Sequence, residues 1–313
     1  MKYIKLSDSE RVGEFNIPDD IIESADDNTF IVVSDSVELP KRFPDTHKGD
    51  YGRLFIVAGS VGYTGAPALC AKAASRFGAG LVYLGVPKRI YDILAVKVDE
   101  EMPFRLPDDN KGQIAANAAS EILRRAKEAD AALIGPGLGL SQAITELMAS
   151  IVRLIKTPLI LDADGINAIA NDIDALRDAV CPLILTPHPG EFRRLGGDPS
   201  PGNRMPSARA FAKEYGCAIV LKGHRSISVF PDGSAYINTT GGPAMAKGGT
   251  GDVLAGMIAA LTAQKFSVKD AVINSVYIHG LAGDLCAAEY GEYSVTASDI
   301  ITRIPHAVYA VRS

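Results

Sequence analysis

The sequence has no tryptophan, a small net charge and no long run of basic residues. Lys and Arg together number 32 against 37 Asp and Glu, which gives a formal net charge of −5. No run of Lys and Arg exceeds two residues. A nucleic-acid-binding surface needs a clustered basic patch. The composition therefore argues against a nucleic-acid partner, whereas the lack of tryptophan excludes nothing.

Cysteine is also sparse. The chain has four cysteines, Cys70, Cys181, Cys217 and Cys286, and no Cys-x-x-Cys pair. Each lies in an apolar stretch, where a buried free thiol is the usual state. The spacing predicts neither a disulfide framework nor a zinc site.

Long apolar runs are missing from the sequence. The N-terminal stretch "MKYIKLSDSERVGEF" lacks the apolar segment of a signal peptide. We find no apolar run approaching the ~20 residues that a membrane-spanning helix needs. We therefore expect a cytoplasmic protein without a membrane partner.

The chain has 313 residues, of which 47% are hydrophobic, enough for one large α/β domain. Residues 1–45 are acidic and contain one β-like run at 30–33, which predicts an N-terminal extension that adds an edge strand. Residues 46–313 form the predicted main body.

Apolar runs of strand length alternate with helical stretches through the main body, which predicts a mostly parallel sheet with helices on both faces. The expected strands lie within 53–59, 81–87, 131–137, 158–164, 182–191, 217–223, 226–231 and 234–238. The expected helices cover 66–80, 113–130, 141–155, 252–264 and 271–290. Nearly every Gly, Pro, Asp and His cluster follows one of these strands, at the carboxyl edge where such sheets bind ligands.

The stretch "KGGTGD" precedes an apolar helix and matches neither the dinucleotide fingerprint nor the P-loop. A glycine turn at a helix N-terminus presents free backbone N–H groups to an anion. Gly249, Thr250 and Gly251 are therefore candidates for an anion site, with Asp252 as a general base for phosphoryl transfer. The alternative is that Asp252 only stabilises the helix dipole, by roughly 0.3–1 kcal/mol.

Two further clusters carry carboxylates. "TPHPGE" places His188 beside Glu191 and predicts either a substrate wall with a metal- or water-holding Glu191, or only a rigid turn. "LDADGIN" ends a strand at Asp162 and Asp164, which are candidates for Mg²⁺ or for a helix cap.

Basic side chains follow another strand in "LKGHRS". Lys222 and Arg225 are candidates for phosphate contacts, and a solvated hairpin turn is the alternative.

Together these stretches resemble the ADP/ATP-dependent NAD(P)H-hydrate dehydratases of the ribokinase-like superfamily. The resemblance spans about residues 47–305. It is carried in order by "HKGDYGRLFIVAGSVGYTGAPALCAKAASRFGAGLVYLGVP", "ALIGPGLG", "LILDADGINAI", "LILTPHPGEFRRL", "VLKG", "GGPAMAKGGTGDVLAG" and "YIHGLAGDLCAAEYGEYSVTASDI".

The resemblance implies a three-layer α/β/α sandwich and a lyase that restores NADH or NADPH from the S epimer of its hydrate. ADP or ATP phosphorylates the ring hydroxyl in such enzymes, Mg²⁺ assists, and phosphate then leaves. It further implies a homo-tetramer. Since only about 45 residues precede the matched body, it also implies that a separate epimerase, or spontaneous epimerisation, converts the other epimer.

The resemblance also implies roles for individual residues. Asp252 would be the base, and the amides of Gly249, Thr250 and Gly251 would form the anion hole. The hydrated cofactor would contact Ala66, Gly137, Gly139, His188 and Asp252. The adenine nucleotide would contact Lys222, Gly223, His224, Arg225, Ser226 and Gly251. Glu191 and Asp162 are the candidate metal ligands.

One departure from the family concerns residues 225–226, which read "RS" in place of a Thr-rich turn. Two other functions fit the same residues. A kinase of this fold acting on a vitamin alcohol, of the hydroxymethylpyrimidine or hydroxyethylthiazole type, would also use Asp252 as the base. A nucleotide-sensing protein would bind ADP without turnover.

Overall fold

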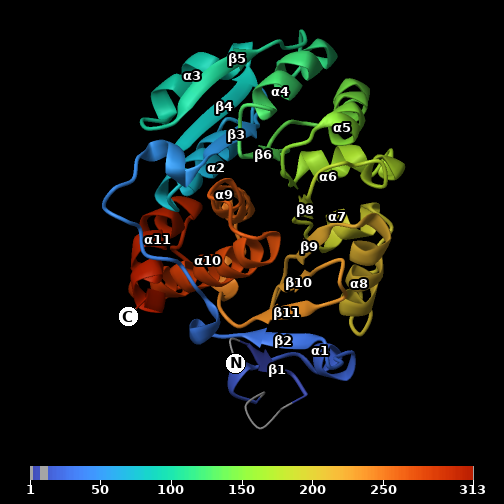
Figure 1. Ribbon diagram of the computed structural model, residues 1–313, viewed down its shortest axis with the longest axis vertical. Helices are drawn as coiled ribbons and strands as arrows, with labels where there is room; N and C mark the ends of the chain where they lie inside the picture. Colours follow the sequence, from blue (N-terminus) through green and yellow to red (C-terminus); the bar gives the residue numbers. More distant parts are fainter. Residues whose placement is uncertain (1–2, 8–12, 313) are drawn as a thin grey trace.

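A computed structural model describes residues 3–7 and 13–312, and its described part is built on one central sheet (Figure 1). The sheet has eleven strands in the order β1-β2-β11-β10-β9-β8-β7-β6-β3-β4-β5. The strands are β1 (Ile4–Lys5), β2 (Thr29–Val32), β3 (Arg53–Val57), β4 (Leu81–Pro87), β5 (Met102–Leu106), β6 (Ala131–Ile134), β7 (Leu159–Leu161), β8 (Leu183–Leu185), β9 (Ala218–Leu221), β10 (Ile227–Val229) and β11 (Ala235–Asn238).

Seven neighbouring strands, from β5 to β9, run parallel, and β10 is antiparallel to both of its neighbours. Successive side chains of a strand point to opposite faces. In β3, Leu54 and Ile56 enter one hydrophobic core, whereas Phe55 and Val57 enter the other. Both faces of the sheet are therefore covered, as expected for continuous apolar strands.

Helices form the outer two layers, which confirms the predicted three-layer α/β/α architecture (Figure 1). Helices α2, α3, α9, α10 and α11 pack on one face, and α1, α4, α5, α6, α7 and α8 pack on the other. Their bounds are α1 (Asp19–Glu23), α2 (Gly65–Arg76), α3 (Tyr91–Lys97), α4 (Ala119–Ala126), α5 (Gln142–Leu154), α6 (Asp164–Ile169), α7 (Pro189–Arg194), α8 (Arg204–Tyr215), α9 (Thr250–Ala263), α10 (Val268–Tyr290) and α11 (Ala297–Arg312). Short 3₁₀ turns are η2 (Ser34–Ser36), η3 (Lys48–Tyr51), η4 (Lys88–Ile90), η5 (Ala116–Ala118), η6 (Ile173–Leu176) and η7 (Pro243–Met245).

The segment before the main body contributes to the sheet. Strand β2 pairs parallel with β11, and β1 pairs antiparallel with β2 at the sheet edge. The β-like run expected at 30–33 thus forms β2, which is internal to the sheet, whereas the edge strand is β1, which was not predicted. Residues 1–2 and 8–12 lie outside the described part.

Two helix predictions were wrong. The helix expected over 113–130 covers only Ala119–Ala126 and follows a 3₁₀ turn. A further long helix, α11, follows the two that were expected to close the chain, and it contains Pro305. Proline inside a helix removes one hydrogen bond, so the sequence signal of α11 is weak although its packing against α10 is extensive.

The expectation about membrane-length apolar runs needs a correction at α10. This helix has 23 residues and is long and apolar enough to cross a membrane by length and composition. However, 72% of its most apolar window is buried inside the protein. Core helices pass the same test, because a helix that is apolar all round is buried by its neighbours.

The cysteines are free, as predicted. Cys70, Cys217 and Cys286 are buried, and Cys181 is partly buried. Burial raises the pKa of the Cys217 thiol to about 12, which keeps it protonated at neutral pH.

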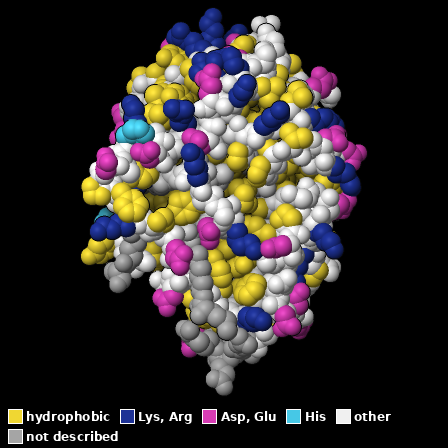
Figure 2. All heavy atoms as spheres, in the orientation of Figure 1, with side chains coloured by type: hydrophobic (Ala, Val, Ile, Leu, Met, Phe, Trp, Pro, Cys, Tyr) yellow, Lys and Arg dark blue, Asp and Glu magenta, His cyan; other side chains and the backbone are white. Residues whose placement is uncertain are grey.

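Acidic and basic side chains are interspersed over the face shown in Figure 2, and basic side chains gather at the end of the molecule formed by α3, β5 and α4. Three arginines of these elements pair with nearby carboxylates. Arg105 contacts Asp92, and Arg124 and Arg125 both contact Glu121. The positive charge at this end is therefore partly neutralised within the chain.

Candidate active site

The polar clusters named from the sequence meet at the carboxyl edge of the parallel strands. Strands β7, β8 and β9 run parallel and end at Leu161, Leu185 and Leu221. The next residues along the chain supply Asp162, Thr186 and Lys222, whose side chains contact one another. The prediction of polar loops along one edge of the sheet is confirmed.

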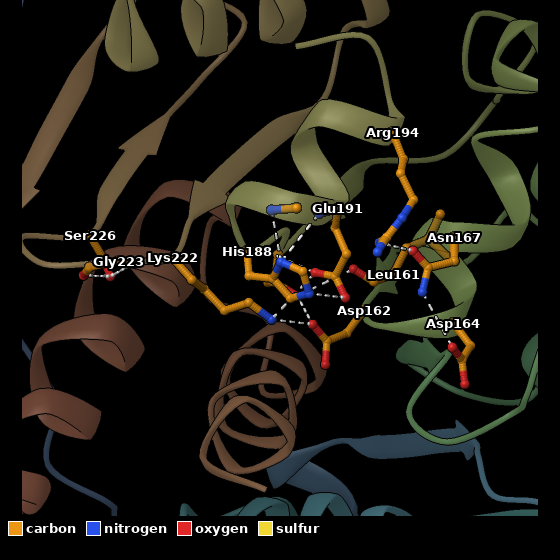
Figure 3. A network of polar contacts seen from close by, with 12 residues as sticks. Leu161, Asp162, Asp164, Asn167, His188, Glu191, Arg194, Lys222, Gly223 and Ser226 are labelled. Carbon is orange, nitrogen blue, oxygen red and sulfur yellow. Dashed lines mark hydrogen bonds and ion pairs between the residues drawn. The ribbon is translucent and has the colours of Figure 1, made fainter. Parts of the chain in front are cut away.

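Lys222 is at the centre of this cluster (Figure 3). Its Nζ lies 2.9 Å from Asp162 Oδ1 and 3.9 Å from Glu191 Oε2. The side chains of Asp162 and Glu191 are only 2% and 5% exposed. Burial lowers the pKa of Lys222, but the two carboxylates outweigh it and the pKa is raised overall. Lys222 is therefore a fixed cation at the site.

Asp162 is held in place by a second contact. The Thr186 hydroxyl donates to Asp162 Oδ1 over 2.6 Å. Thr186 lies in the "TPHPGE" stretch, but its contact with a residue 24 positions earlier has no sequence signal.

The predicted anion site is a turn at the start of α9. Gly249 is the N-cap residue with φ 93°, and a Cβ there would lie 2.7 Å from Leu69 Cδ1. The positive φ therefore favours glycine at this position, and a Cβ would also require Leu69 to shift. The first-turn N–H groups of a helix have no acceptor within the helix and face the approach to its end. Gly251 lies close to Lys222, since a Cβ on Gly251 would be 3.3 Å from Nζ.

Asp252 is in the first turn of α9 and has an unusual acidity. Burial and the negative charge of Asp162 raise its pKa to about 7, although Lys222 acts in the opposite direction. A general base works best when its pKa is near the operating pH. The geometry and the charge therefore fit the predicted base, whereas an Asp that only capped a helix would keep a low pKa.

Asp164 organises the neighbouring loop. Its Oδ2 accepts a 2.8 Å hydrogen bond from the backbone N–H of Gly139, and its Oδ1 accepts one from Asn167. Between the two aspartates, Ala163 has φ 49°, a conformation that L-residues rarely adopt. Strain of this kind persists where surrounding structure holds it, and it recurs at functional sites.

Three of the predicted substrate residues lie close together, two in the loop after β6 and one in the first turn of α2. Gly137 has φ 66°, and a Cβ there would lie 3.2 Å from the Cβ of Ala66. Ser60, which the sequence analysis did not single out, donates to the Gly137 carbonyl and lies 3.6 Å from a Cβ built on Gly139. The structure therefore places Ala66, Gly137 and Gly139 around one small-residue surface.

His188 is the N-cap residue of α7. Its Nδ1 accepts hydrogen bonds from the backbone N–H groups of Gly190 and Glu191, over 2.9 and 3.2 Å. Because Nδ1 accepts both bonds, Nε2 carries the ring N–H. In this half-exposed ring, Nε2 lies 3.4 Å from Glu191 Oε1. The rigid-turn and substrate-wall interpretations are thus compatible at this residue.

The predicted metal ligands Glu191 and Asp162 face the Lys222 ammonium. The backbone N–H of His188 donates to Glu191 Oε2, completing a capping box. Among the described residues, no group of three or more His, Cys, Asp or Glu side chains is arranged to hold a metal ion. Mg²⁺ is usually bound by one or two carboxylates together with substrate phosphates. The side chains present fit that mode and do not fit a closed protein cage.

A cavity of about 410 Å³ adjoins the α9 turn. Of the predicted nucleotide contacts, it is lined by Lys222, Gly223, His224, Ser226 and Gly251. Arg225 does not line it, which corrects that prediction. Its guanidinium donates instead to the Thr239 carbonyl, just after β11.

The cavity wall includes His279, which sequence reasoning missed. Burial lowers the pKa of His279 to about 4, so its ring is neutral. Its Nε2 has no hydrogen-bond partner among the described residues. The histidine lies within the quoted "YIHGLAGD" stretch, but a lone His inside an apolar helix is more often a core residue, so the pattern gave no reason to place it beside a ligand.

Comparison with known families and structures identifies the family of this chain. The family model for NAD(P)H-hydrate dehydratase matches residues 54–306. This chain belongs to the NAD(P)H-hydrate dehydratase family. A relative from Bacillus subtilis, the ADP-dependent (S)-NAD(P)H-hydrate dehydratase, is 36% identical over 85% of this chain and 93% of its own length.

Other members of the family are longer. The bifunctional NAD(P)H-hydrate repair enzyme of Moorella thermoacetica is 40% identical over 86% of this chain and 51% of its own length. A similar enzyme of Thermofilum pendens is 39% identical over 90% of this chain and 54% of its own length. The chain thus spans about half the length of these curated relatives.

Solved structures agree with the family assignment. The ADP/ATP-dependent NAD(P)H-hydrate dehydratase of Bacillus subtilis, co-crystallised with ATP and Mg²⁺, gives a TM-score of 0.74 at 30% identity, with 89% of this chain and 97% of that chain covered. A hydroxyethylthiazole kinase from Pyrococcus horikoshii gives 0.56 at 14% identity, covering 84% of this chain and 89% of that chain, which shows a shared fold alone.

Proposed function

We propose that this protein uses ADP or ATP to dehydrate the hydrates of NADH and NADPH, and thereby restores the reduced cofactors. The single observation that carries the proposal is Asp252, a partly buried carboxylate with a pKa of about 7 in the first turn of α9. A base and an anion site in one turn are what phosphorylation of an alcohol needs. Family membership supplies the substrate class.

The first step is phosphorylation of the ring hydroxyl. Asp252 accepts the hydroxyl proton while the oxygen attacks the terminal phosphorus of the nucleotide, and the bond to the leaving phosphate oxygen breaks. The first-turn amides of α9 stabilise the transferring phosphoryl group. Lys222, close to Gly251, supplies a positive charge to the same group. Mg²⁺ held on the nucleotide phosphates would offset further negative charge.

The second step is elimination. The new C–O–phosphate bond breaks and phosphate leaves with the bonding electrons, while the adjacent ring carbon loses a proton and the ring double bond re-forms. Hydroxide is a poor leaving group and phosphate is a good one, which is why the nucleotide is consumed. Ala66, Gly137, Gly139 and His188 surround the ring in this proposal.

We also propose the finer properties that the resemblance implies. The substrate is the S epimer, an epimerase converts the other epimer, and the protein acts as a cytoplasmic homo-tetramer. The bifunctional repair enzymes among the relatives support the link with an epimerase. Light scattering of the purified protein tests the tetramer directly.

The deciding experiment follows reduced-nicotinamide absorbance and free phosphate together. The protein is incubated with NADH hydrate, Mg²⁺ and either ADP or ATP. A nucleotide-dependent rise matched by phosphate release supports the dehydratase. A persisting phosphate ester of a small alcohol, without a rise, would instead favour the vitamin-alcohol kinase.

The Asp252→Asn variant tests the base. We expect turnover to fall by at least ~10²-fold while nucleotide binding is retained, because a positioned base contributes on that scale. Asp270→Asn is the matched control, since Asp270 is also in the first turn of a helix, α10, and carries no role in this proposal. Equal turnover in the two variants would remove Asp252 from the chemistry.

A further inference from the structure

A second, larger cavity of about 900 Å³ lies outside the site described above. It follows α2 and is closed by α11 and by the residues before β5. Helices α2 and α11 pack against each other (Figure 1). The names of the related enzymes assign no ligand to this groove. The mechanism proposed above does not involve it.

One end of the groove adjoins the active site. Gly65 and Leu69 line the groove, and Ala66 of the predicted substrate surface is in the same helical turn. Leu69 is also the side chain that approaches Gly249 at the anion site. The groove then continues along the length of α2, whose 12 residues span about 18 Å.

Cationic side chains lie along this path. Lys97 donates to the Thr64 hydroxyl over 2.8 Å at the site end of α2. Lys72 follows further along the helix, and its Nζ lies 3.9 Å from Asp99 Oδ2, which is long for an ion pair. Both ammonium groups are thus available to oxygen anions, and a pyrophosphate is a suitable partner in such a groove.

The other end of the groove holds a buried carboxylate. Glu101 lines the groove, yet its residue is only 4% exposed. Neither carboxylate oxygen has a hydrogen-bond partner among the described residues. A buried acceptor without a donor is costly, so such groups are nearly always satisfied by a partner or a ligand. The missing donors fit the vicinal hydroxyls of a ribose, which carboxylates bind in other dinucleotide sites.

We propose that this groove binds the adenosine diphosphate half of the hydrated dinucleotide, with the pyrophosphate on Lys72 and Lys97 and the adenosine ribose hydroxyls on Glu101. The inference rests on the function proposed above. It also assigns a specificity. The lining near Glu101 includes two further acids, Asp99 and Glu100, and one arginine, Arg76. The excess of acid disfavours a 2′-phosphate, so NADH hydrate is preferred over NADPH hydrate.

The test compares three substrates: NADH hydrate, NADPH hydrate and the hydrate of reduced nicotinamide mononucleotide, which lacks the adenylate half. For Lys72→Ala we expect KM for NADH hydrate to rise about tenfold with kcat unchanged, since a lost charge-assisted hydrogen bond is worth about one decade of affinity. The mononucleotide hydrate should be unaffected. Lys213→Ala, on α8 and outside the groove, is the matched control.

Glu101→Gln tests the specificity. We expect the preference for NADH hydrate over NADPH hydrate to shrink about tenfold, because the amide does not repel a 2′-phosphate. Glutamine has nearly the same shape, so the fold is preserved. Should this variant not fold, Lys72→Ala still decides the binding mode.

These experiments distinguish an error in this inference from an error in the proposed function. If the wild type converts NADH hydrate but Lys72→Ala changes both substrates equally, or neither, the groove is not the adenylate site. A wild type that prefers NADPH hydrate would overturn the role of Glu101. If the wild type converts no hydrate, the proposed function is wrong. Fluorescence titration with NADH then tests the groove alone, and equal affinity of wild type and Lys72→Ala would overturn it.

Discussion

Asp252 shows how the site sets the acidity of one carboxylate. Its burial and the charge of Asp162 act against ionisation, and Lys222 acts for it. Lys222 cannot neutralise Asp252 fully, because its Nζ is already 2.9 Å from Asp162. The ammonium of Lys222 is thus shared among several carboxylates. Asp252 has the weakest contact with it and keeps a pKa of about 7. This division of charge separates a structural acid from a reactive one.

The first prediction at this scale is a pH profile. Only ionised Asp252 accepts a proton, so kcat/KM should fall about tenfold per pH unit below pH 7 and level off above it. The measurement is the initial rate at low NADH-hydrate concentration between pH 5 and 9 in buffers of constant ionic strength. A profile that is flat through pH 7 would contradict the assignment of Asp252 as the titrating base.

The second residue-scale prediction concerns stability. The pKa of Asp252 is about 7 in the folded protein and about 3.9 in an unfolded chain. The folded state therefore binds the proton more tightly, and this contribution to stability is lost as pH rises towards 7. Asp252→Asn should raise the free energy of unfolding at pH 8, by at most about 4 kcal/mol, since a tenfold change in proton affinity is worth about 1.4 kcal/mol.

Urea unfolding of wild type and variant measures this effect. The gain should shrink as pH falls from 8 towards 5, because the wild-type carboxyl then becomes protonated in the folded state. Asp270→Asn should show no such pH-dependent gain. If the variant is less stable than wild type at pH 8, the neighbours of Asp252 must stabilise its ionised carboxylate in the folded protein.

At the scale of elements, the site depends on the close approach between the loop that follows β6 and the loop that follows β7. Gly135 follows β6 with φ 141°, and a Cβ there would lie 1.8 Å from the Asp162 carbonyl oxygen. The next turn contains Ala163 with its positive φ. The close approach and the strained turn together fix the directions of Asp162 and Asp164.

Gly135→Ala should therefore destabilise the protein strongly, by about 3 kcal/mol or more, because backbone must move to relieve the clash. The matched control is Gly216→Ala, where φ is also positive at 62° but nothing lies within 4 Å of a built Cβ. We expect that control to lose only about 1 kcal/mol. Thermal unfolding of both variants checks the comparison. Equal losses would show that conformation, and not the close approach, requires glycine at position 135.

Many of the helices and strands were predictable from the local sequence pattern. The strand expected over 81–87 matches β4 residue for residue, because its apolar run is bounded by glycine and proline turns. Short elements with weak patterns, such as α3 and β5, were not identified. The Lys222–Asp162 contact joins residues 60 positions apart. Only the parallel order of the strands brings them together, and a single sequence does not contain that order. The prediction for Arg225 failed because its guanidinium donates to the Thr239 carbonyl and does not line the cavity, a contact without a sequence signal.

At the scale of the whole molecule, the question is whether residues 1–45 form a separate extension. Strand β2 lies between β1 and β11 and is not itself an edge strand. Ile31 and Val32 of β2 enter the two different cores of the main body. This arrangement makes β2 a structural member of the sheet, joined to the strand that precedes the proposed nucleotide cavity.

The last prediction follows from that arrangement. Ile31→Ala should lower the free energy of unfolding by about 2–5 kcal/mol, as truncation of a fully buried aliphatic side chain does. Ile31 is 0% exposed, whereas Ile22 in α1 is 38% exposed, so Ile22→Ala is the matched control with a small expected loss. Unfolding of Ile31→Ala should remain a single transition and should carry the nucleotide cavity with it, because β11 pairs with β2 along its whole length. Calorimetry with and without ADP checks both points. A separate early transition that leaves the ADP-dependent stabilisation intact would show instead that the N-terminal segment folds independently and that the boundary near residue 45 is a true domain boundary.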